Sequence, residues 1–101
     1  MKKKLSIVFF GRKNCEYSVK IKNLLKKKCK KLFYFESSKI NERINLKKIN
    51  EKYFDYILCF RSFFIIDKKL LKRCKKYAIN FHPGTPEFRG IGSVNFALYN
   101  N

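Results

Sequence analysis

The chain has little of what interrupts regular structure and little of what performs acid–base chemistry. Its 101 residues include four glycines, two prolines and one histidine. Three of the glycines, both prolines and the histidine fall within residues 78–92, AINFHPGTPEFRGIG. Because glycine and proline mark turns and loops, this window is the main loop that the sequence predicts. It is also the first place to look for a functional site.

Long apolar runs are absent as well. No segment reaches the ~18 apolar residues that a membrane span needs. The start, MKKKLSIVFFG, pairs basic residues with an apolar run, but that run covers only Leu5–Phe10 and no small-residue cleavage site follows. We therefore predict a first strand here rather than a signal peptide, and a cytoplasmic protein.

Metal-binding patterns are missing too. The four cysteines, Cys15, Cys29, Cys59 and Cys74, form no C-x-x-C pair, and the chain has only one histidine. Both observations argue against a zinc site. Two disulfides are the alternative, but nothing else indicates secretion. Buried free thiols are the favoured interpretation.

Acidic residues are scarce: seven Asp and Glu face 25 Lys and Arg, for a net charge of +18. Such a surplus can neutralise phosphates, so nucleic acid is one candidate partner. Most of the cations are lysines spread along the chain, however, whereas base-reading and phosphate-clamping sites favour arginine. A solvated basic surface is the favoured interpretation, and an anionic partner stays open.

Apolar runs and helical stripes alternate along the chain. Runs that read as buried strands cover residues 4–11, 31–37, 56–60 and 77–81. Helical spacings fall between and after them, at Tyr17, Ile21, Leu24 and Leu25 with Asn14 as cap, at Leu46, Ile49 and Tyr53, at Leu70, Leu71 and Cys74 with Asp67 as cap, and at Val94, Ala97 and Leu98. This order predicts one α/β domain over residues 1–101, Rossmann-like, with a mostly parallel sheet and helices on both faces.

Two nucleotide-binding signatures are absent. The loop after the first strand has the lone Gly11 in place of a glycine-rich fingerprint, and no P-loop pattern occurs. Ligands of open α/β sheets bind at the carboxyl ends of the strands, and the fourth strand ends in Asn80-Phe81-His82. Because side chains alternate between the two faces of a strand, Asn80 and His82 should lie on the same face of the sheet. Pro83 lacks an amide donor and should end the strand. His82 as a simple loop-bonding residue is the competing interpretation.

The segment NFHPGTPEFRGIGSVNFALYN resembles the core motif of the folate-dependent formyltransferases. The family's hallmark is Asn-x-His-Pro followed by Pro-x-aromatic-Arg-Gly, here residues 86–90. The specific likeness covers about 40 residues at the end of the chain, and a weaker one extends back to the first strand. The segment NFALYN is most similar to the N-formyltransferases of nucleotide-linked amino sugars.

The resemblance implies formyl transfer from N10-formyltetrahydrofolate to an amine. Asn80 and His82 match the family's catalytic amide and imidazole, which stabilise the tetrahedral oxyanion and move the proton. Phe64, Ile65 and Ile66 match the segment whose backbone binds the folate, although plain core packing also explains their apolar character. The implied partner is a small-molecule amine, a nucleotide-linked amino sugar. We expect no membrane partner, and nucleic acid is disfavoured as a partner. A homodimer of a full-length form is compatible with it.

The sequence departs from the family in one respect. The family's third catalytic residue, an Asp in a later loop, has no match here, and the aspartates Asp55 and Asp67 precede the site. We therefore expect a domain truncated after the fourth strand and the helix that follows, with weak or no activity alone. Methionyl-tRNA formyl transfer and a non-enzymatic basic binding protein remain the alternatives.

Overall fold

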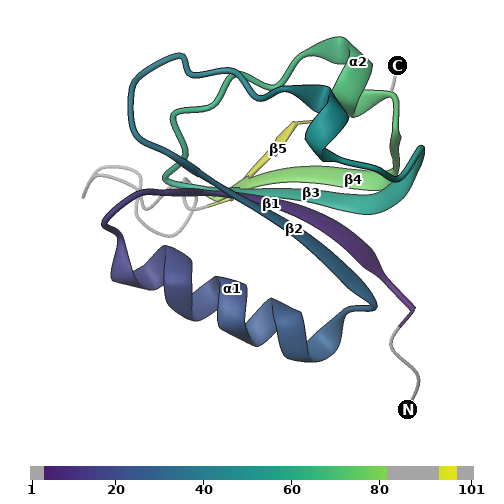
Figure 1. Cartoon of the computed structure of the whole chain (residues 1–101), viewed down its shortest axis with the longest axis horizontal. Coiled ribbons are helices and arrows are strands. Elements are labelled where there is room, and N and C mark those ends of the chain that lie inside the picture. Colours follow the sequence, from purple (N-terminus) through teal and green to yellow (C-terminus); the bar gives the residue numbers. More distant parts are fainter. Residues whose placement is uncertain (1–3, 82–93, 98–101) are drawn as a thin grey trace.

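The computed structural model describes residues 4–81 with their side chains and residues 94–97 as backbone. Within this part of the chain, five strands form one sheet in the order β2-β1-β3-β4-β5 (Figure 1). The strands are β1 Ser6–Arg12, β2 Lys31–Ser37, β3 Phe54–Phe60, β4 Cys74–Phe81 and β5 Val94–Ala97. The first four are mutually parallel, and β5 pairs antiparallel with β4. The predicted Rossmann-like α/β architecture is confirmed.

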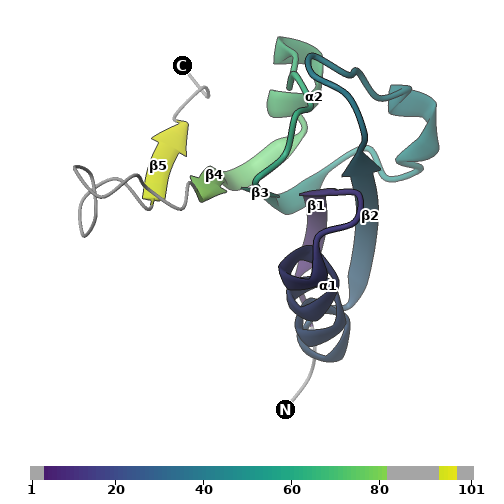
Figure 2. The same ribbon diagram turned by 90° about the vertical axis from the view of Figure 1, so that its left-hand side faces the viewer.

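Helices lie on both faces of the sheet (Figure 2). The helix α1, Glu16–Lys28, packs under β1 and β2. The short helix α2, Lys68–Leu71, and the 3-10 turn η1, Leu46–Lys48, lie on the opposite side. None of the described helices is long and apolar enough to cross a membrane.

Alternating side chains of the strands build two apolar clusters. On the α2 side, Val8, Phe10, Ile57 and Leu70 are fully buried with Phe54. On the α1 side, the core consists of Ile7, Phe9 and Cys29, with half-buried residues around them. The central strand β1 is therefore buried on both faces, as its uninterrupted apolar run predicts. Each fully buried large side chain contributes about 1.5–3 kcal/mol to stability.

The apolar stripe predicted for α1 is wrong at Tyr17 and Leu24, which are 52% and 54% exposed. The helix instead turns Ser18, Ile21 and Leu25 toward the sheet. Ser18 explains the rotation, because a Cβ at Gly11 would lie 2.9 Å from the Ser18 Cβ. Only glycine allows this close approach, and the approach fixes which side of α1 faces β1. The cap is also different: Cys15, not Asn14, is the N-cap residue.

The helix predicted around Leu46, Ile49 and Tyr53 is reduced to η1, a single turn. The carbonyl groups of Ile49, Glu51 and Lys52 do not bond to later amides of a helix. They accept hydrogen bonds from the guanidinium of Arg73. A distant side chain thus replaces helical hydrogen bonds, and this is not visible in local periodicity.

Two further predictions at the C-terminal side are corrected. The helix that begins after Asp67 ends at Leu71, and Cys74 is the first residue of β4, paired with Phe54. The helix predicted through Val94 and Ala97 is the strand β5, whose backbone pairs with the outer edge of β4. Strand pairing satisfies backbone groups that β4 would otherwise leave open. Leu98 lies outside the described residues.

Candidate functional site

The carboxyl ends of the parallel strands meet at one edge of the sheet, and a cavity of about 290 Å³ lies beside them. Its floor comes from residues of β3 and β4, Ile79 among them, and its wall from the segment that follows β3. The lining includes Ile57, Cys59, Ser62, Phe64, Ile65, Ile66, Leu71, Ala78 and Asn80. This cavity therefore brings together the residues that the sequence predicted separately, Asn80 and the segment Phe64–Ile66.

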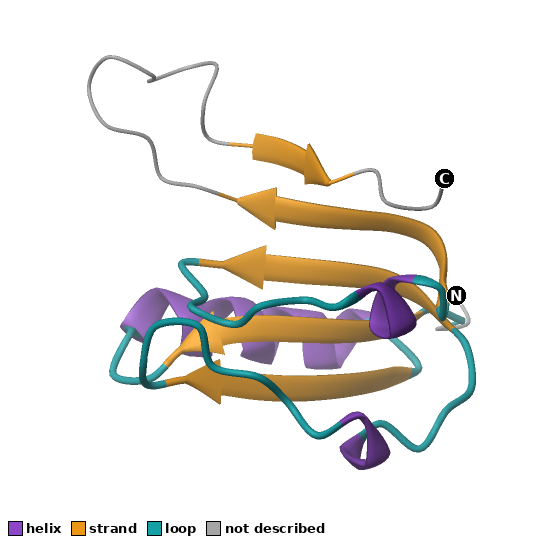
Figure 3. Cartoon of the chain, turned by 90° about the horizontal axis from the view of Figure 1, so that it is seen from above, coloured by secondary structure: helices purple, strands orange, loops and turns teal. Residues whose placement is uncertain are grey.

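The wall is formed because the chain reverses direction at Arg61. This residue has φ 54°, in the left-handed region that few non-glycine residues adopt. The loop after β3 then runs back over the sheet toward α2 (Figure 3). The reversal places residues 62–66 above the strands rather than beyond them.

Side chains from β1 and β2 hold this wall in place. The buried hydroxyl of Ser37 donates to the Gly11 carbonyl (3.0 Å) and accepts from the Phe63 amide (2.9 Å). The Nε of Arg12 donates to the Arg61 carbonyl at 2.7 Å, and its guanidinium lies 4.0 Å from the Phe63 ring centroid. Two strand ends therefore fix the segment that covers the cavity.

Asn80 lies on β4, where the pairing register sets it beside Cys59 of β3. Both residues line the cavity. An amide side chain at this point can donate to a developing negative charge, the chemistry that an oxyanion site requires. His82, the other predicted catalytic residue, lies outside the described residues.

The folate-binding prediction is refined residue by residue. Phe64 packs on the core, with its ring centroid 5.0 Å from that of Phe10, while Ile65 is exposed. The Phe64 amide donates to the Ser62 hydroxyl (3.0 Å) and the Ile65 amide to the Glu42 carbonyl (2.9 Å). Those two amides already have partners within the chain, so backbone carbonyls and the Ile66 amide are what the segment can offer a ligand.

Cys59 and Ser62 line the site although no sequence pattern predicted them there. Burial raises the pKa of the Cys59 thiol to about 12, so the thiol is neutral at physiological pH. The Cys59 thiol therefore contributes a small polarizable surface to the cavity and does not act as a nucleophile. The only available signal was its register: Cys59 precedes the end of β3 by one residue, as Asn80 precedes the end of β4 by one.

The prediction of four buried thiols is correct for Cys29 and Cys59 and wrong for Cys15 and Cys74, which are half-buried. Partial burial raises the pKa of the Cys15 thiol. Hydrogen bonds with Ser18 and the Tyr17 amide and the positive charge of Arg61 oppose this, and the net result is a pKa below the ordinary value. Cys15 is thus the most reactive thiol that the structure describes.

A second, larger hollow of about 660 Å³ lies at the end of β2 and shares Phe64 with the first. Four cations line it, namely Lys13, Lys22, Arg43 and Lys48. Its two carboxylates are engaged internally: Glu36 accepts from the Tyr34 hydroxyl (2.7 Å) and Glu42 from the Ser38 amide (2.8 Å). The hollow therefore has four cations against two carboxylates, and its net charge is positive.

Comparison of the chain with models of known protein families, with curated proteins and with solved structures finds no match.

Proposed function

We propose that the chain carries a site for formyl transfer from N10-formyltetrahydrofolate to the amine of a nucleotide-linked amino sugar. The observation that supports this most is the cavity shared by Asn80 and the segment Phe64–Ile66. The resemblance assigned these residues to catalysis and to folate binding from the sequence alone, without knowledge of the wall that covers them.

The cavity suits one part of the donor. Its volume of about 290 Å³ is at the lower end of ligand pockets, enough for a flat bicyclic ring but not for a whole folate. Apolar walls from Ile57, Leu71 and Ala78 match the faces of such a ring. Backbone carbonyls of the segment Phe64–Ile66 would accept from its amino and amide groups.

The bound donor supplies the formyl group, and the protein supplies orientation and electrostatics. The Asn80 amide would donate a hydrogen bond to the oxygen of the formyl group as the amine attacks. That bond strengthens as negative charge develops, so it lowers the barrier. By the resemblance, His82 would accept the proton that the attacking amine loses.

The basic hollow favours a sugar nucleotide as the acceptor. A nucleotide-linked sugar carries a diphosphate, and Lys13, Arg43 and Lys48 line the hollow that adjoins the proposed donor site. Cationic side chains bind phosphate oxygens through charge-assisted hydrogen bonds. The proposal also includes a cytoplasmic location for the protein.

The decisive experiment is calorimetric titration of the purified chain with 5-formyltetrahydrofolate, a stable analogue of the donor. We expect saturable binding that Ala78→Leu abolishes, because the larger side chain fills the cavity beside Asn80. The matched control is Tyr77→Leu, a change at the next residue, whose side chain points to the other face. Absence of binding to the folded wild-type chain, or equal binding by Ala78→Leu, would overturn the proposal.

A turnover assay then separates the roles. With N10-formyltetrahydrofolate and a uridine diphosphate amino sugar, Asn80→Ala should lower kcat about 10²–10³-fold, the effect of losing one oxyanion donor. Arg43→Gln should raise KM for the sugar nucleotide and leave binding of the folate analogue unchanged. A normal kcat in Asn80→Ala would contradict its catalytic assignment.

A further inference from the structure

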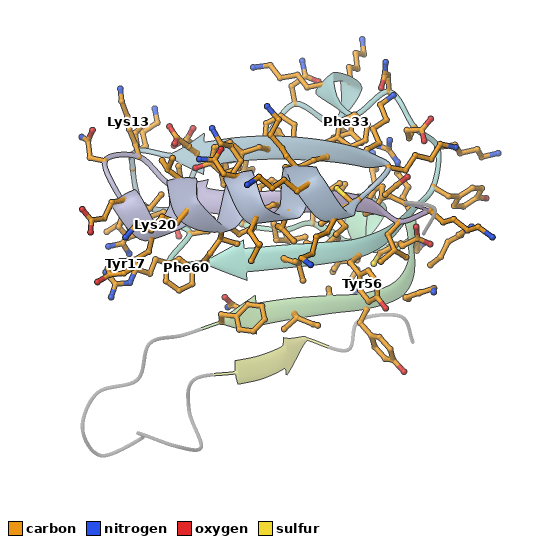
Figure 4. The ribbon with its side chains drawn as sticks, turned by 90° about the horizontal axis from the view of Figure 1, so that it is seen from below. Lys13, Tyr17, Lys20, Phe33, Tyr56 and Phe60 are labelled. Atoms are coloured by element: carbon orange, nitrogen blue, oxygen red, sulfur yellow. The ribbon has the colours of Figure 1, made fainter. Side chains whose placement is uncertain are left out.

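The face of the sheet that carries α1 is only half covered. Contacts of α1 with the sheet are made to β1 and β2. Figure 4 shows this helix lying over those two strands, with β3 and β4 exposed beside it. Parallel sheets normally have helices on both faces over their full width, so the bare half calls for an occupant.

The exposed half consists of two apolar rows in register. On β3 the row is Tyr56, Leu58 and Phe60, and each pairs with a residue of β4, namely Tyr77, Ile79 and Phe81. We call these six residues the open apolar face. Tyr77 is 54% exposed and the other five are half-buried. Four of the six are tyrosine or phenylalanine, aromatic residues that contribute much of the energy of binding interfaces.

Cations border this face. The guanidinium of Arg61 lies 5.6 Å from the Phe60 ring centroid and 5.8 Å from that of Tyr17. The ammonium of Lys20 lies 5.7 Å from the Tyr17 ring, and that of Lys76 lies 5.8 Å from the Tyr56 ring. None of the three forms an ion pair with another described residue. The border is thus positive and unneutralised on both the α1 side and the β4 side.

The dimensions fit one helix. Two neighbouring strands span about 10 Å across, which matches the 10–12 Å diameter of a helix with its side chains. A strand of about 23 Å is as long as a helix of roughly 15 residues. α1 occupies the adjacent pair of strands in the same manner.

The charge decides between occupants. Each copy of this chain carries a net charge of +18, so two copies repel each other, and this repulsion opposes a close homodimer. An acidic segment would instead pair with Arg61, Lys20 and Lys76. We propose that the open apolar face binds an amphipathic α-helix of a partner protein, with an apolar stripe toward β3 and β4 and Asp or Glu along its flanks.

The test uses the full chain and a fluorescent helix-forming peptide of about 15 residues with a leucine stripe and glutamate flanks. We expect saturable binding that weakens as salt is raised. One control peptide has lysine flanks, and a second has the same composition in scrambled order. Neither should bind, because the first lacks the acidic flanks and the second lacks the continuous apolar stripe. Equal binding of either control would overturn the proposal.

Variants of the protein locate the site. Tyr77→Ser removes an exposed ring and should weaken binding at least about fivefold, whereas Tyr53→Ser, which removes an equally exposed ring in a loop, should not. Lys20→Gln with Lys76→Gln should weaken binding and flatten its salt dependence, and Lys47→Gln with Lys48→Gln on η1 should do neither. Circular dichroism confirms that each variant is folded.

Two outcomes would replace the partner helix by another occupant. If sedimentation of the chain alone shows a salt-stable dimer that Tyr77→Ser abolishes, the face binds a second copy. Binding to vesicles of phosphatidylcholine and phosphatidylglycerol through the same residues, with no peptide binding, would assign it to a membrane surface. Either result would overturn the proposal.

Discussion

At the scale of single residues, the stability of the candidate site rests on a few polar side chains outside it. Ser37 is fully buried at the end of β2, and its hydroxyl satisfies both the Gly11 carbonyl and the Phe63 amide. No residue of the cavity lining replaces these two hydrogen bonds. The wall of the cavity therefore depends on a residue from a strand that does not contribute to its floor.

Ser37→Ala should lower the free energy of unfolding by about 1–3 kcal/mol, since it removes the hydroxyl's hydrogen bonds to the buried Gly11 carbonyl and to the part-buried Phe63 amide. Urea denaturation measures this change. The neighbouring Ser38→Ala is the control, because Ser38 is exposed and its hydroxyl makes only a long contact of 3.4 Å to Glu42. A loss in Ser37→Ala no larger than in Ser38→Ala would show that the bridge is energetically unimportant.

Cysteine reactivity is a second prediction at this scale. Iodoacetamide should label Cys15 first, at a pH below that of an ordinary thiol, because the pKa of Cys15 is lowered and thiolate is the reactive form. Cys59, with its pKa raised to about 12, should be labelled only as the chain unfolds. Peptide mass spectrometry over a pH series measures both rates. Labelling of Cys59 as early as Cys15 in the folded chain would contradict the structure.

At the scale of elements, the sequence predicts a helix or strand correctly where local contacts determine it, and incorrectly where contacts distant in the sequence determine it. The four parallel strands could be predicted because their apolar runs are long and each is bounded by polar or basic residues. Parallel topology placed Asn80 at the edge where ligands bind, whereas the segment Phe64–Ile66 was assigned to the site only by the resemblance. The resemblance supplied the roles of these residues but not the wall above them.

The errors have tertiary causes. The turn η1 is short because Arg73 takes the carbonyl groups that a longer helix would use. The rotation of α1 follows from the contact of Ser18 with Gly11, and β5 forms along an edge that β4 provides. None of these partners lies within the local window that periodicity examines, so sequence patterns could not reveal them.

The capping of α2 gives a prediction for an element. A helix of four residues has few internal hydrogen bonds, so its start matters more than in a long helix. The Asp67 carboxylate accepts from the Leu70 amide at 3.0 Å. Asp67→Ala should therefore lower the free energy of unfolding by about 0.5–2 kcal/mol, as measured by thermal or urea denaturation.

Asp67→Asn is the matched control, because an asparagine side chain can accept the same hydrogen bond. It should keep most of the stability that Asp67→Ala loses. Since Leu70 and Leu71 of this helix are buried against the sheet, and Leu71 lines the cavity, Asp67→Ala should also weaken binding of the folate analogue. Equal stability of the alanine and asparagine variants would show that the cap contributes nothing.

At the scale of the whole molecule, one property affects every measurement: the net charge of +18 on 101 residues. Like charges at this density repel within the folded chain, and dissolved salt screens the repulsion. Conversely, the same charge attracts anions without specificity, so binding assays need controls at several salt concentrations. The folding stability and the ligand affinities should therefore respond to salt in opposite directions.

Raising sodium chloride from 20 to 300 mM should increase Tm, and about 1 kcal/mol of relieved repulsion corresponds to roughly 4–8 °C for a chain of this size. Differential scanning calorimetry measures the shift. Lys30→Glu with Lys75→Glu, at two exposed positions outside the helices, should raise Tm at low salt and reduce the response to salt. Lys30→Arg with Lys75→Arg keeps the charge and should behave as the wild type. If both double variants respond to salt like the wild type, charge repulsion is not what limits the stability of this fold.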